Sequence, residues 1–155
     1  MILTPEIKTI LVAATPIFEL RGAIPLALGV YKLSFWSAYG LAVMGNVIPV
    51  FFILWLLETV SNFLSRHFYF FNRFFAWLFE RTRDHHKHSF ERWETLALVI
   101  LVAIPLPLTG AWTGALAAFV FGIPAKKAFL LITAGVMIAG AIVTLATLGI
   151  INLFI

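Results

Sequence analysis

The sequence predicts an all-α integral membrane protein, built as an inverted duplication of a re-entrant helical hairpin and a transmembrane helix, with an amphipathic interfacial linker helix between the copies. Composition is the first observation behind this prediction. Hydrophobic residues make up 62% of the chain and charged residues 12%, against about 45–50% and about a quarter in soluble domains. One soluble core of this chain length could not bury that much apolar surface.

The second observation is a pattern that occurs once in each half of the chain. An apolar segment interrupted by prolines, polar groups and glycine is followed by an unbroken apolar segment. Broken segments at matching positions of two halves are typical of transporters with a site at the bilayer midplane. The predicted boundaries are a single membrane domain 1–155, a first repeat 1–60 (hairpin 7–33, transmembrane helix 35–60), a linker 61–94, and a second repeat 95–155 (hairpin 95–122, transmembrane helix 126–155).

The first broken segment contains Pro16, Glu19, Arg21, Gly22 and Pro25. A charged side chain at the centre of a spanning helix costs roughly 2.5–3.5 kcal/mol on insertion scales. Glu19 and Arg21 are two residues apart, so on a regular helix they point to different faces and do not pair. Charges and prolines also argue against a removable signal peptide. A hairpin that breaks near residues 19–22 avoids the cost.

The second broken segment carries two prolines, Pro105 and Pro107, which remove backbone donors and disfavour helical angles in the residues before them. Irregular backbone at membrane depth is tolerated only where protein or water surrounds it. A tip buried against its inverted twin provides such surroundings. The alternative is that all four apolar segments cross the membrane, with both termini and the linker in the cytoplasm.

The linker is basic and aromatic. Because lysine and arginine in short loops favour the cytoplasmic side, we expect the linker there. Phe71, Phe74, Phe75 and Leu78 follow helical spacing, which predicts an amphipathic helix in the membrane interface, although a soluble partner could use the same face. The basic residues of the linker are Arg66, Arg73, Arg81, Arg83, Lys87 and Arg92, six of the eleven in the chain.

The two tips form the candidate binding site. Thr109 is placed to cap the returning arm of the second hairpin, and Pro25 falls in the first turn of the returning arm of the first. Both arms would then aim helix N-termini into the protein, and with Arg21 these suit a phosphate or carboxylate. Alternatively, Arg21 bonds carbonyls that the break leaves free.

Glu19 is the candidate proton carrier, because burial favours the protonated form of a carboxylate. The alternatives are a fixed ion pair across the hairpins, or with Arg21 if the tip is irregular. Asn46, beside Gly45, could face the first tip or make an ordinary helix–helix hydrogen bond.

Small residues recur every four positions at Gly110, Gly114, Ala118 and Gly122, and we interpret them as a surface for close helix packing. Trp112 could cover a substrate, but we favour a packing role beside these glycines.

Other functional classes find little support. The chain has no cysteine, and the cluster Asp84, His85, His86, Lys87 and His88 lacks the spacing of convergent ligands, so we predict neither a metal site nor a cofactor. No nucleophile–base pair, phosphate-binding loop or dinucleotide motif occurs. We therefore expect no enzyme activity, and we attribute the net charge of +4 to membrane topology rather than to nucleic-acid binding.

The segments Pro16-Ile-Phe-Glu-Leu-Arg-Gly-Ala-Ile-Pro25 and Pro105-Leu-Pro-Leu-Thr-Gly-Ala-Trp-Thr-Gly114 resemble the two signature segments of the small multidrug export protein family. That family is more remotely similar to the DedA/VTT superfamily of membrane proteins. The resemblance implies two inverted re-entrant repeats and, through the superfamily, movement of phospholipids or polyprenyl phosphates between leaflets, with proton coupling in bacterial members. Glu19 matches the acidic residue expected on the first hairpin. The arginine expected on the second hairpin is missing: Thr109 stands there, and Arg21 lies on the first.

We therefore expect a multi-pass transporter of the cytoplasmic membrane, acting as a homodimer among membrane lipids on an amphipathic substrate. The leading hypothesis is an anionic lipid or lipid phosphate as cargo. A proton-coupled exporter of cationic amphiphiles, with Glu19 as the counter-ion, and a non-transporting scaffold that recruits partners through the linker are the alternatives.

Overall fold

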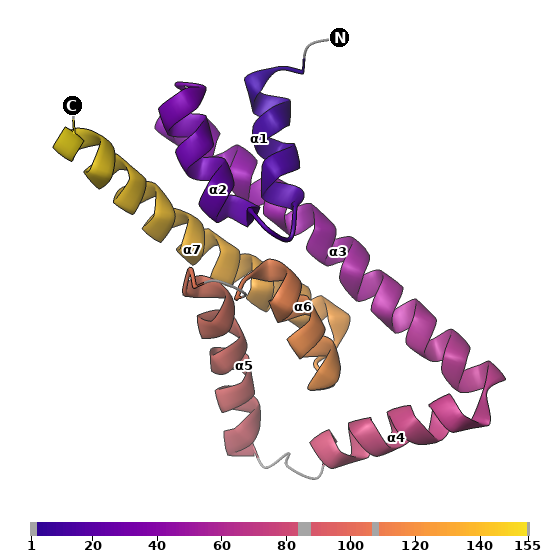
Figure 1. Cartoon of the computed structure of the whole chain (residues 1–155). Helices are drawn as coiled ribbons and strands as arrows, with labels where there is room; N and C mark the ends of the chain where they lie inside the picture. The colour runs from indigo at the N-terminus through magenta and orange to yellow at the C-terminus, as the bar shows by residue number, and fades with distance from the viewer. Residues whose placement is uncertain (1–2, 84–87, 107–108, 155) are drawn as a thin grey trace.

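The computed structural model describes residues 3–83, 88–106 and 109–154, and over these ranges the chain forms helices joined by turns, without a strand (Figure 1). The helices are α1 (Pro5–Ala14), α2 (Glu19–Pro25), the π-helical turn η1 (Leu26–Val30), α3 (Phe35–His67), α4 (Tyr69–Arg83), α5 (His88–Ala103), α6 (Ala111–Val120) and α7 (Ala125–Phe154). The predicted helical class is confirmed.

The first broken segment forms two short helices that run in opposite directions (Figure 1). Helix α1 begins with Pro5 in its first turn, where the missing amide hydrogen costs little. It ends at Thr15, whose φ of −76° and ψ of 143° are extended, because the following Pro16 disfavours helical angles there. Pro25 is the last residue of α2 rather than part of its first turn. That prediction was wrong, as was the expected break near residues 19–22, because the chain turns between Ala14 and Glu19 and α2 already begins at Glu19.

Helices α3 and α7 are long enough to cross a membrane. They contain 33 and 30 residues, and at 1.5 Å per residue they are about 50 and 45 Å long, more than the ~30 Å of hydrocarbon. In the most apolar stretch of 18 residues in each helix, only 28% of α3 and 39% of α7 is buried within the molecule. Their exposed apolar surface therefore needs a lipid or protein environment. Helix α3 starts at the cap residue Ser34, whose hydroxyl accepts from the amide of Ser37 at 3.3 Å.

The second broken segment also forms two antiparallel helices, α5 and α6 (Figure 1). Helix α5 ends just before Ile104 and Pro105, as expected for a residue that precedes proline. Helix α6 ends in a Schellman motif: the amide of Ile123 donates to Ala118 at 2.9 Å, and Gly122, at φ 70°, donates to Phe119 at 3.0 Å. Gly122 is thus a helix cap rather than a member of the small-residue packing surface.

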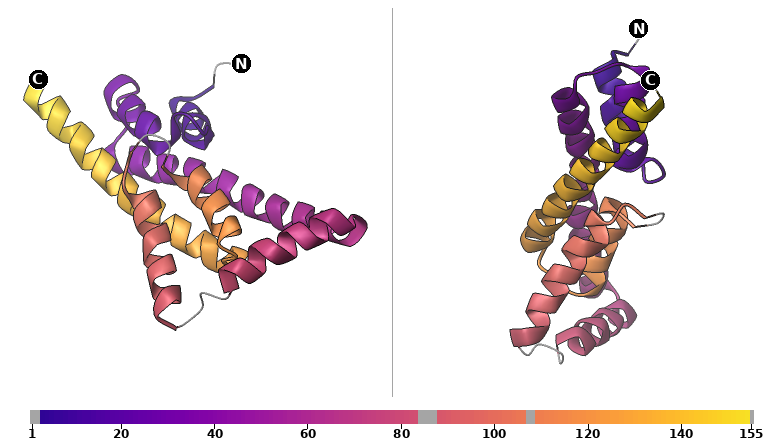
Figure 2. Two further views of the ribbon diagram at one scale, coloured as in Figure 1. Left: turned by 60° about the horizontal axis from the view of Figure 1, so that its bottom comes forward. Right: turned by 90° about the vertical axis from the view of Figure 1, so that its left-hand side faces the viewer.

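Each pair of short helices packs against both long helices. Helix α1 packs against α3 as α5 packs against α7, and α2 contacts both long helices as α6 does. The two long helices run antiparallel side by side, and the hydroxyl of Tyr39 on α3 donates to the carbonyl of Met137 on α7 at 3.0 Å. Both ends of the chain lie at one end of the molecule and α4 lies at the other (Figures 1 and 2).

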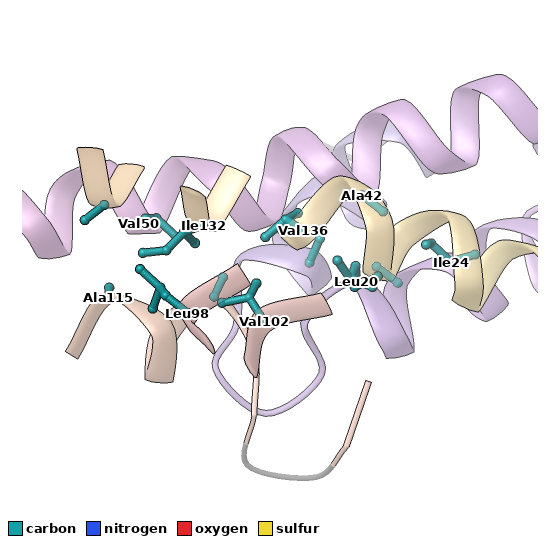
Figure 3. Packing of buried hydrophobic residues seen from close by; sticks show 14 of the residues in the cluster. Leu20, Ile24, Ala42, Val50, Leu98, Val102, Ala115, Ile132 and Val136 are labelled. Carbon is teal, nitrogen blue, oxygen red and sulfur yellow. The ribbon is translucent and has the colours of Figure 1, made fainter. Parts of the chain in front are cut away.

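The buried core runs between the long helices and both pairs of short ones. Small residues allow the closest approaches: a Cβ on Gly45 would lie 2.5 Å from the carbonyl oxygen of Ile10, and a Cβ on Gly114 would lie 2.5 Å from Val102. Gly114 and Ala118 are buried, in agreement with the predicted packing role. Figure 3 labels Leu20 and Ile24 of α2, Ala42 and Val50 of α3, Leu98 and Val102 of α5, Ala115 of α6, and Ile132 and Val136 of α7.

Helix α4 lies within the predicted linker, although α3 continues into that linker as far as His67. Aromatic side chains cover much of α4. Phe75 packs edge-on against Phe119 of α6 with ring centroids 6.2 Å apart, whereas Tyr69 and Phe70 are strongly exposed. Helix α4 therefore contacts the second pair of short helices and still presents an aromatic surface.

Candidate functional site

The turn between α1 and α2 meets the turn between α5 and α6 in the middle of the molecule. We call residues 15–22 the first tip and residues 104–112, apart from 107 and 108, the second tip. Arg21 joins them: its guanidinium donates to the backbone carbonyls of Leu106 and Thr109. The guanidinium of Arg21 therefore binds the irregular backbone of the second tip, where the carbonyl of Leu106 also accepts from the amide of Thr109 at 3.2 Å.

Arg21 also binds the carboxylate of Glu19 on its own tip. One guanidinium nitrogen lies 3.2 Å from Oε2 of Glu19. This is the ion pair expected if the tip is irregular, since on a regular helix the two side chains would point to different faces. Glu19 has a φ of 47°, a left-handed conformation that is uncommon for a residue with a side chain. This angle departs from regular helical geometry and accompanies the irregular turn that brings the two charges together.

The carboxylate of Glu19 also caps the first turn of α6. It accepts hydrogen bonds from the backbone amides of Ala111 and Trp112, although Glu19 lies far from them in sequence. The cap residue itself is Gly110, with φ 155° and ψ −161° and no side-chain cap bond. A Cβ on Gly110 would overlap the carboxylate of Glu19. Glycine at this position therefore makes room for the carboxylate.

Thr109 does not cap α6, contrary to the prediction from sequence. Its hydroxyl lies 2.9 Å from the carbonyl oxygens of both Ile104 and Leu106, and its one hydrogen is shared between them. Thr109 therefore holds the second tip in its turn, and the carboxylate from the other tip performs the capping.

A small cavity lies behind this contact. Glu19, Arg21, Asn46 and Thr109 all line it, so the structure brings together the four residues predicted as a site. Its volume of about 10 Å³ leaves room for no more than about one water molecule. Asn46 is 1% exposed, and its Oδ1 has no hydrogen-bond partner within the described part of the chain.

The remaining predicted residues shape the two tips. Pro16 is exposed on the first tip, and a Cβ on Gly22 would lie 2.9 Å from the Cβ of Phe18. Pro105 lines the cavity, and Trp112 has a buried indole nitrogen without a partner among the described residues. Pro107 lies outside the described residues, as do residues 84–87 of the histidine cluster. Within the described residues, no group of three potential metal ligands occurs.

Three donors thus converge on one anion. The guanidinium of Arg21 and the amides of Ala111 and Trp112 all bind the carboxylate of Glu19. Charged hydrogen bonds and a helix N-terminus are the usual means by which proteins bind carboxylates and phosphates. Protonation of Glu19 would remove the negative charge that these donors bind. The sequence predicts a helix N-terminus and Arg21 at this place, but not that the carboxylate of Glu19 is the anion they bind, because a cap supplied by a distant segment leaves no local signal.

A family model described as "Putative small multi-drug export protein" matches residues 19–142. The chain belongs to this family. The match to the small multi-drug export protein family begins at Glu19 and covers both sides of the contact between the tips. Together with the two apolar helices long enough to span a bilayer, membership of this family identifies a membrane protein. Comparison with curated proteins and with solved structures finds no match.

Proposed function

We propose that this member of the small multi-drug export family is a proton-coupled transporter for an amphipathic anion, and that the tips are in contact in its closed state. The observation that carries the proposal is the position of the Glu19 carboxylate, held by Arg21 and by the first amides of α6. This carboxylate belongs to the protein, yet it occupies a position suited to a substrate carboxylate or phosphate.

The proposed architecture places α3 and α7 across the cytoplasmic membrane and makes the two pairs of short helices re-entrant from opposite sides. Two features support an inverted duplication of this kind. The contacts of α1 and α2 are repeated by those of α5 and α6, and both ends of the chain lie opposite α4. The basic linker that contains α4 would be cytoplasmic.

Protonation of Glu19 would weaken the contact between the tips. A protonated Glu19 no longer forms an ion pair with Arg21. Its carboxylic acid O–H can then donate a hydrogen bond to the unpartnered Oδ1 of Asn46. The N–H of Arg21 that binds Glu19 and the amides of α6 would then be available to the anionic group of a substrate. The other N–H groups of Arg21 would still bind the carbonyls of Leu106 and Thr109. Among the described residues that line the cavity, Arg21 is the charged group that faces Glu19.

A second copy of the chain is the proposed partner at the first tip. The turn Thr15–Phe18 projects from the side of the bundle (Figure 2), and Ile17 is 84% exposed. Irregular backbone at the depth of the hydrocarbon needs protein or water around it. A homodimer that covers this turn would supply that cover, and disulfide crosslinking of an Ile17→Cys variant in membranes would detect it.

Export of cationic amphiphiles is the second candidate, and the description of the family favours it. In that reaction Glu19 would be the counter-ion of the drug. Arg21, 3.2 Å from the carboxylate, would have to move away before a cation could bind. The third candidate, a scaffold, would depend on the exposed aromatic surface of α4, and removal of α4 without loss of transport would exclude it.

The test is transport by the full chain in lipid vesicles. The probes are phosphatidate with a fluorescent acyl chain, followed by dithionite bleaching, and ethidium. We expect the wild type to speed phosphatidate movement between leaflets and a pH gradient to increase the rate. Glu19→Gln should abolish the response to the gradient. Arg21→Lys should slow transport by about tenfold or more, because lysine lacks the planar guanidinium that can bind a phosphate through two N–H groups at once.

The control is Glu80→Gln, an exposed carboxylate of α4 outside the cavity, which should transport as the wild type does. Movement of ethidium without movement of phosphatidate would overturn the anionic substrate in favour of drug export. If neither probe moves, both candidates are contradicted, the transport of an amphipathic anion and the export of cationic amphiphiles.

A further inference from the structure

Two adjoining hollows lie away from the tips, where α3 and the start of α7 meet. They share Leu54, Glu58 and Ala125 in their walls. The larger, of about 330 Å³, is mostly apolar, and the smaller, of about 220 Å³, reaches Ser61 and Asn62. The larger volume lies within the range of about 300–1,000 Å³ that is usual for small-molecule sites.

The larger hollow contains one charge of each sign. Glu58 and Lys126 both line it, and no ion pair joins them in the part of the chain that the structure describes. Both side chains are exposed, so each charge is available to a ligand. A purely cationic ligand would be repelled by Lys126 and a purely anionic one by Glu58.

Aromatic side chains also line the larger hollow. Phe51 of α3 and Phe129 of α7 pack edge to face with centroids 6.2 Å apart, and Trp55 lies beside them. Tryptophan and lysine are typical of the boundary between hydrocarbon and headgroups. Glu58 follows directly on the apolar run 47–57 of α3, so the hollow spans this boundary, with its aromatic wall toward the hydrocarbon.

The smaller hollow offers oxygen atoms to a donor. Ser61 is buried and Asn62 lies beside it, and both are close to Glu58 in the wall. A primary ammonium has three hydrogens to donate, and a carboxylate, a hydroxyl and an amide oxygen can accept them.

We propose that the two hollows bind one zwitterionic phospholipid with a primary ammonium headgroup. The ammonium binds Glu58 from the smaller hollow, the phosphate binds Lys126, and an acyl chain lies along Phe51 and Phe129. Such a ligand satisfies both charges of the wall at once. The site lies apart from Glu19 and Arg21, and its occupation does not depend on the transport proposed above.

Native mass spectrometry of the full chain in detergent tests the proposal. The probes are equimolar phosphatidylethanolamine, phosphatidylcholine and phosphatidylglycerol with identical acyl chains. The wild type should retain phosphatidylethanolamine in preference to the other two. Glu58→Gln should reduce the preference for phosphatidylethanolamine over phosphatidylglycerol by about tenfold. Lys126→Gln should reduce the retention of phosphatidylethanolamine by a similar factor, since each substitution removes a charged hydrogen bond.

Two matched controls make the same charge changes outside both hollows, Glu80→Gln and the neighbouring Lys127→Gln, and both should bind as the wild type does. If a neutralised variant does not fold, Glu58→Asp and Lys126→Arg replace it and should keep the lipid preference. Equal retention of the three lipids by the wild type, preference for phosphatidylglycerol, or unchanged selectivity in Glu58→Gln and Lys126→Gln would each overturn the proposal.

Discussion

At the scale of single residues, the carboxylate of Glu19 interacts with groups from both halves of the chain. Arg21 is its neighbour in sequence, whereas the amides of Ala111 and Trp112 come from α6. The space for this carboxylate exists because position 110 has no side chain. Two substitutions separate the structural role of these residues from their proposed role in transport.

The first prediction is that Gly110→Ala destabilises the closed state. The new methyl group would overlap the carboxylate of Glu19, and the backbone at φ 155° is one that L-residues rarely adopt. Strain of this kind costs about 1–3 kcal/mol, so we expect a lower melting temperature in detergent. Gly40→Ala is the control, because its methyl group would meet no atom within 4 Å; a helical alanine there should be neutral or stabilising. An equal loss in both variants would contradict the prediction.

The second prediction concerns Asn46. In the closed state its buried Oδ1 has no partner among the described residues, so Asn46→Leu should leave stability unchanged or raise it by about 1 kcal/mol. The same variant should lose much of the response of transport to a pH gradient, because the acceptor for protonated Glu19 is gone. Thermal unfolding and vesicle transport measure the two effects. If Asn46 instead makes a purely structural hydrogen bond, Asn46→Leu should clearly lose stability and keep the normal response of transport to a pH gradient.

At the scale of elements, close helix contacts depend on positions without side chains. Helix α1 crosses α3 at Gly45, where the nearest atom is a backbone oxygen, and α5 meets α6 at Gly114, where the nearest atom is a methyl carbon of Val102. Backbone atoms cannot be removed by mutation, but a methyl group can. A second substitution should therefore relieve the steric overlap of an added methyl group at Gly114 but not at Gly45.

The third prediction is that Gly114→Ala is destabilising by about 1–3 kcal/mol, and that Val102→Ala relieves part of this loss. The double variant should be more stable than the sum of the single effects predicts, by at least about 0.5 kcal/mol in a double-mutant cycle. Gly45→Ala should be destabilising without relief from Val102→Ala, since Val102 is not among the nearest atoms there. Gly149→Ala, which meets nothing within 4 Å, serves as the control. Simple additivity at positions 102 and 114 would show that the two side chains do not interact.

At the scale of the whole molecule, the two ends of the chain lie together and opposite α4 (Figure 1). With α3 and α7 as the membrane-crossing helices, the termini and α4 fall on different sides of the membrane. If all four apolar segments crossed the membrane instead, the two termini and α4 would all lie on the same side. Topology therefore separates the two architectures.

The fourth prediction is the labelling pattern of single cysteines at Leu3, Glu80 and Asn152, introduced into a chain that has none. All three positions are exposed. In intact cells, a membrane-impermeant maleimide should label positions 3 and 152, whereas position 80 should react only after lysis. Protection of all three until lysis would favour four crossing helices and would count against re-entrant hairpins.

Much of the helical plan can be predicted from local sequence. The end of α5 before Pro105 follows from the steric effect of proline on the preceding residue. The same effect ends α1 before Pro16, although the sequence predicts the first break a few residues later. The long apolar runs give α3 and α7, and the four residues chosen as a site do line one cavity. These features depend on neighbouring residues or on gross hydrophobicity, so they need no knowledge of the fold.

Only the tertiary structure decides how the two tips bind each other. The pairing of Glu19 with Arg21 accompanies a left-handed backbone angle that the spacing of the two residues does not reveal. The cap of α6 is a carboxylate from another segment rather than the hydroxyl of Thr109. Both are contacts between segments distant in sequence, and their geometry is fixed by the packing of α2 and α6 against the same two long helices.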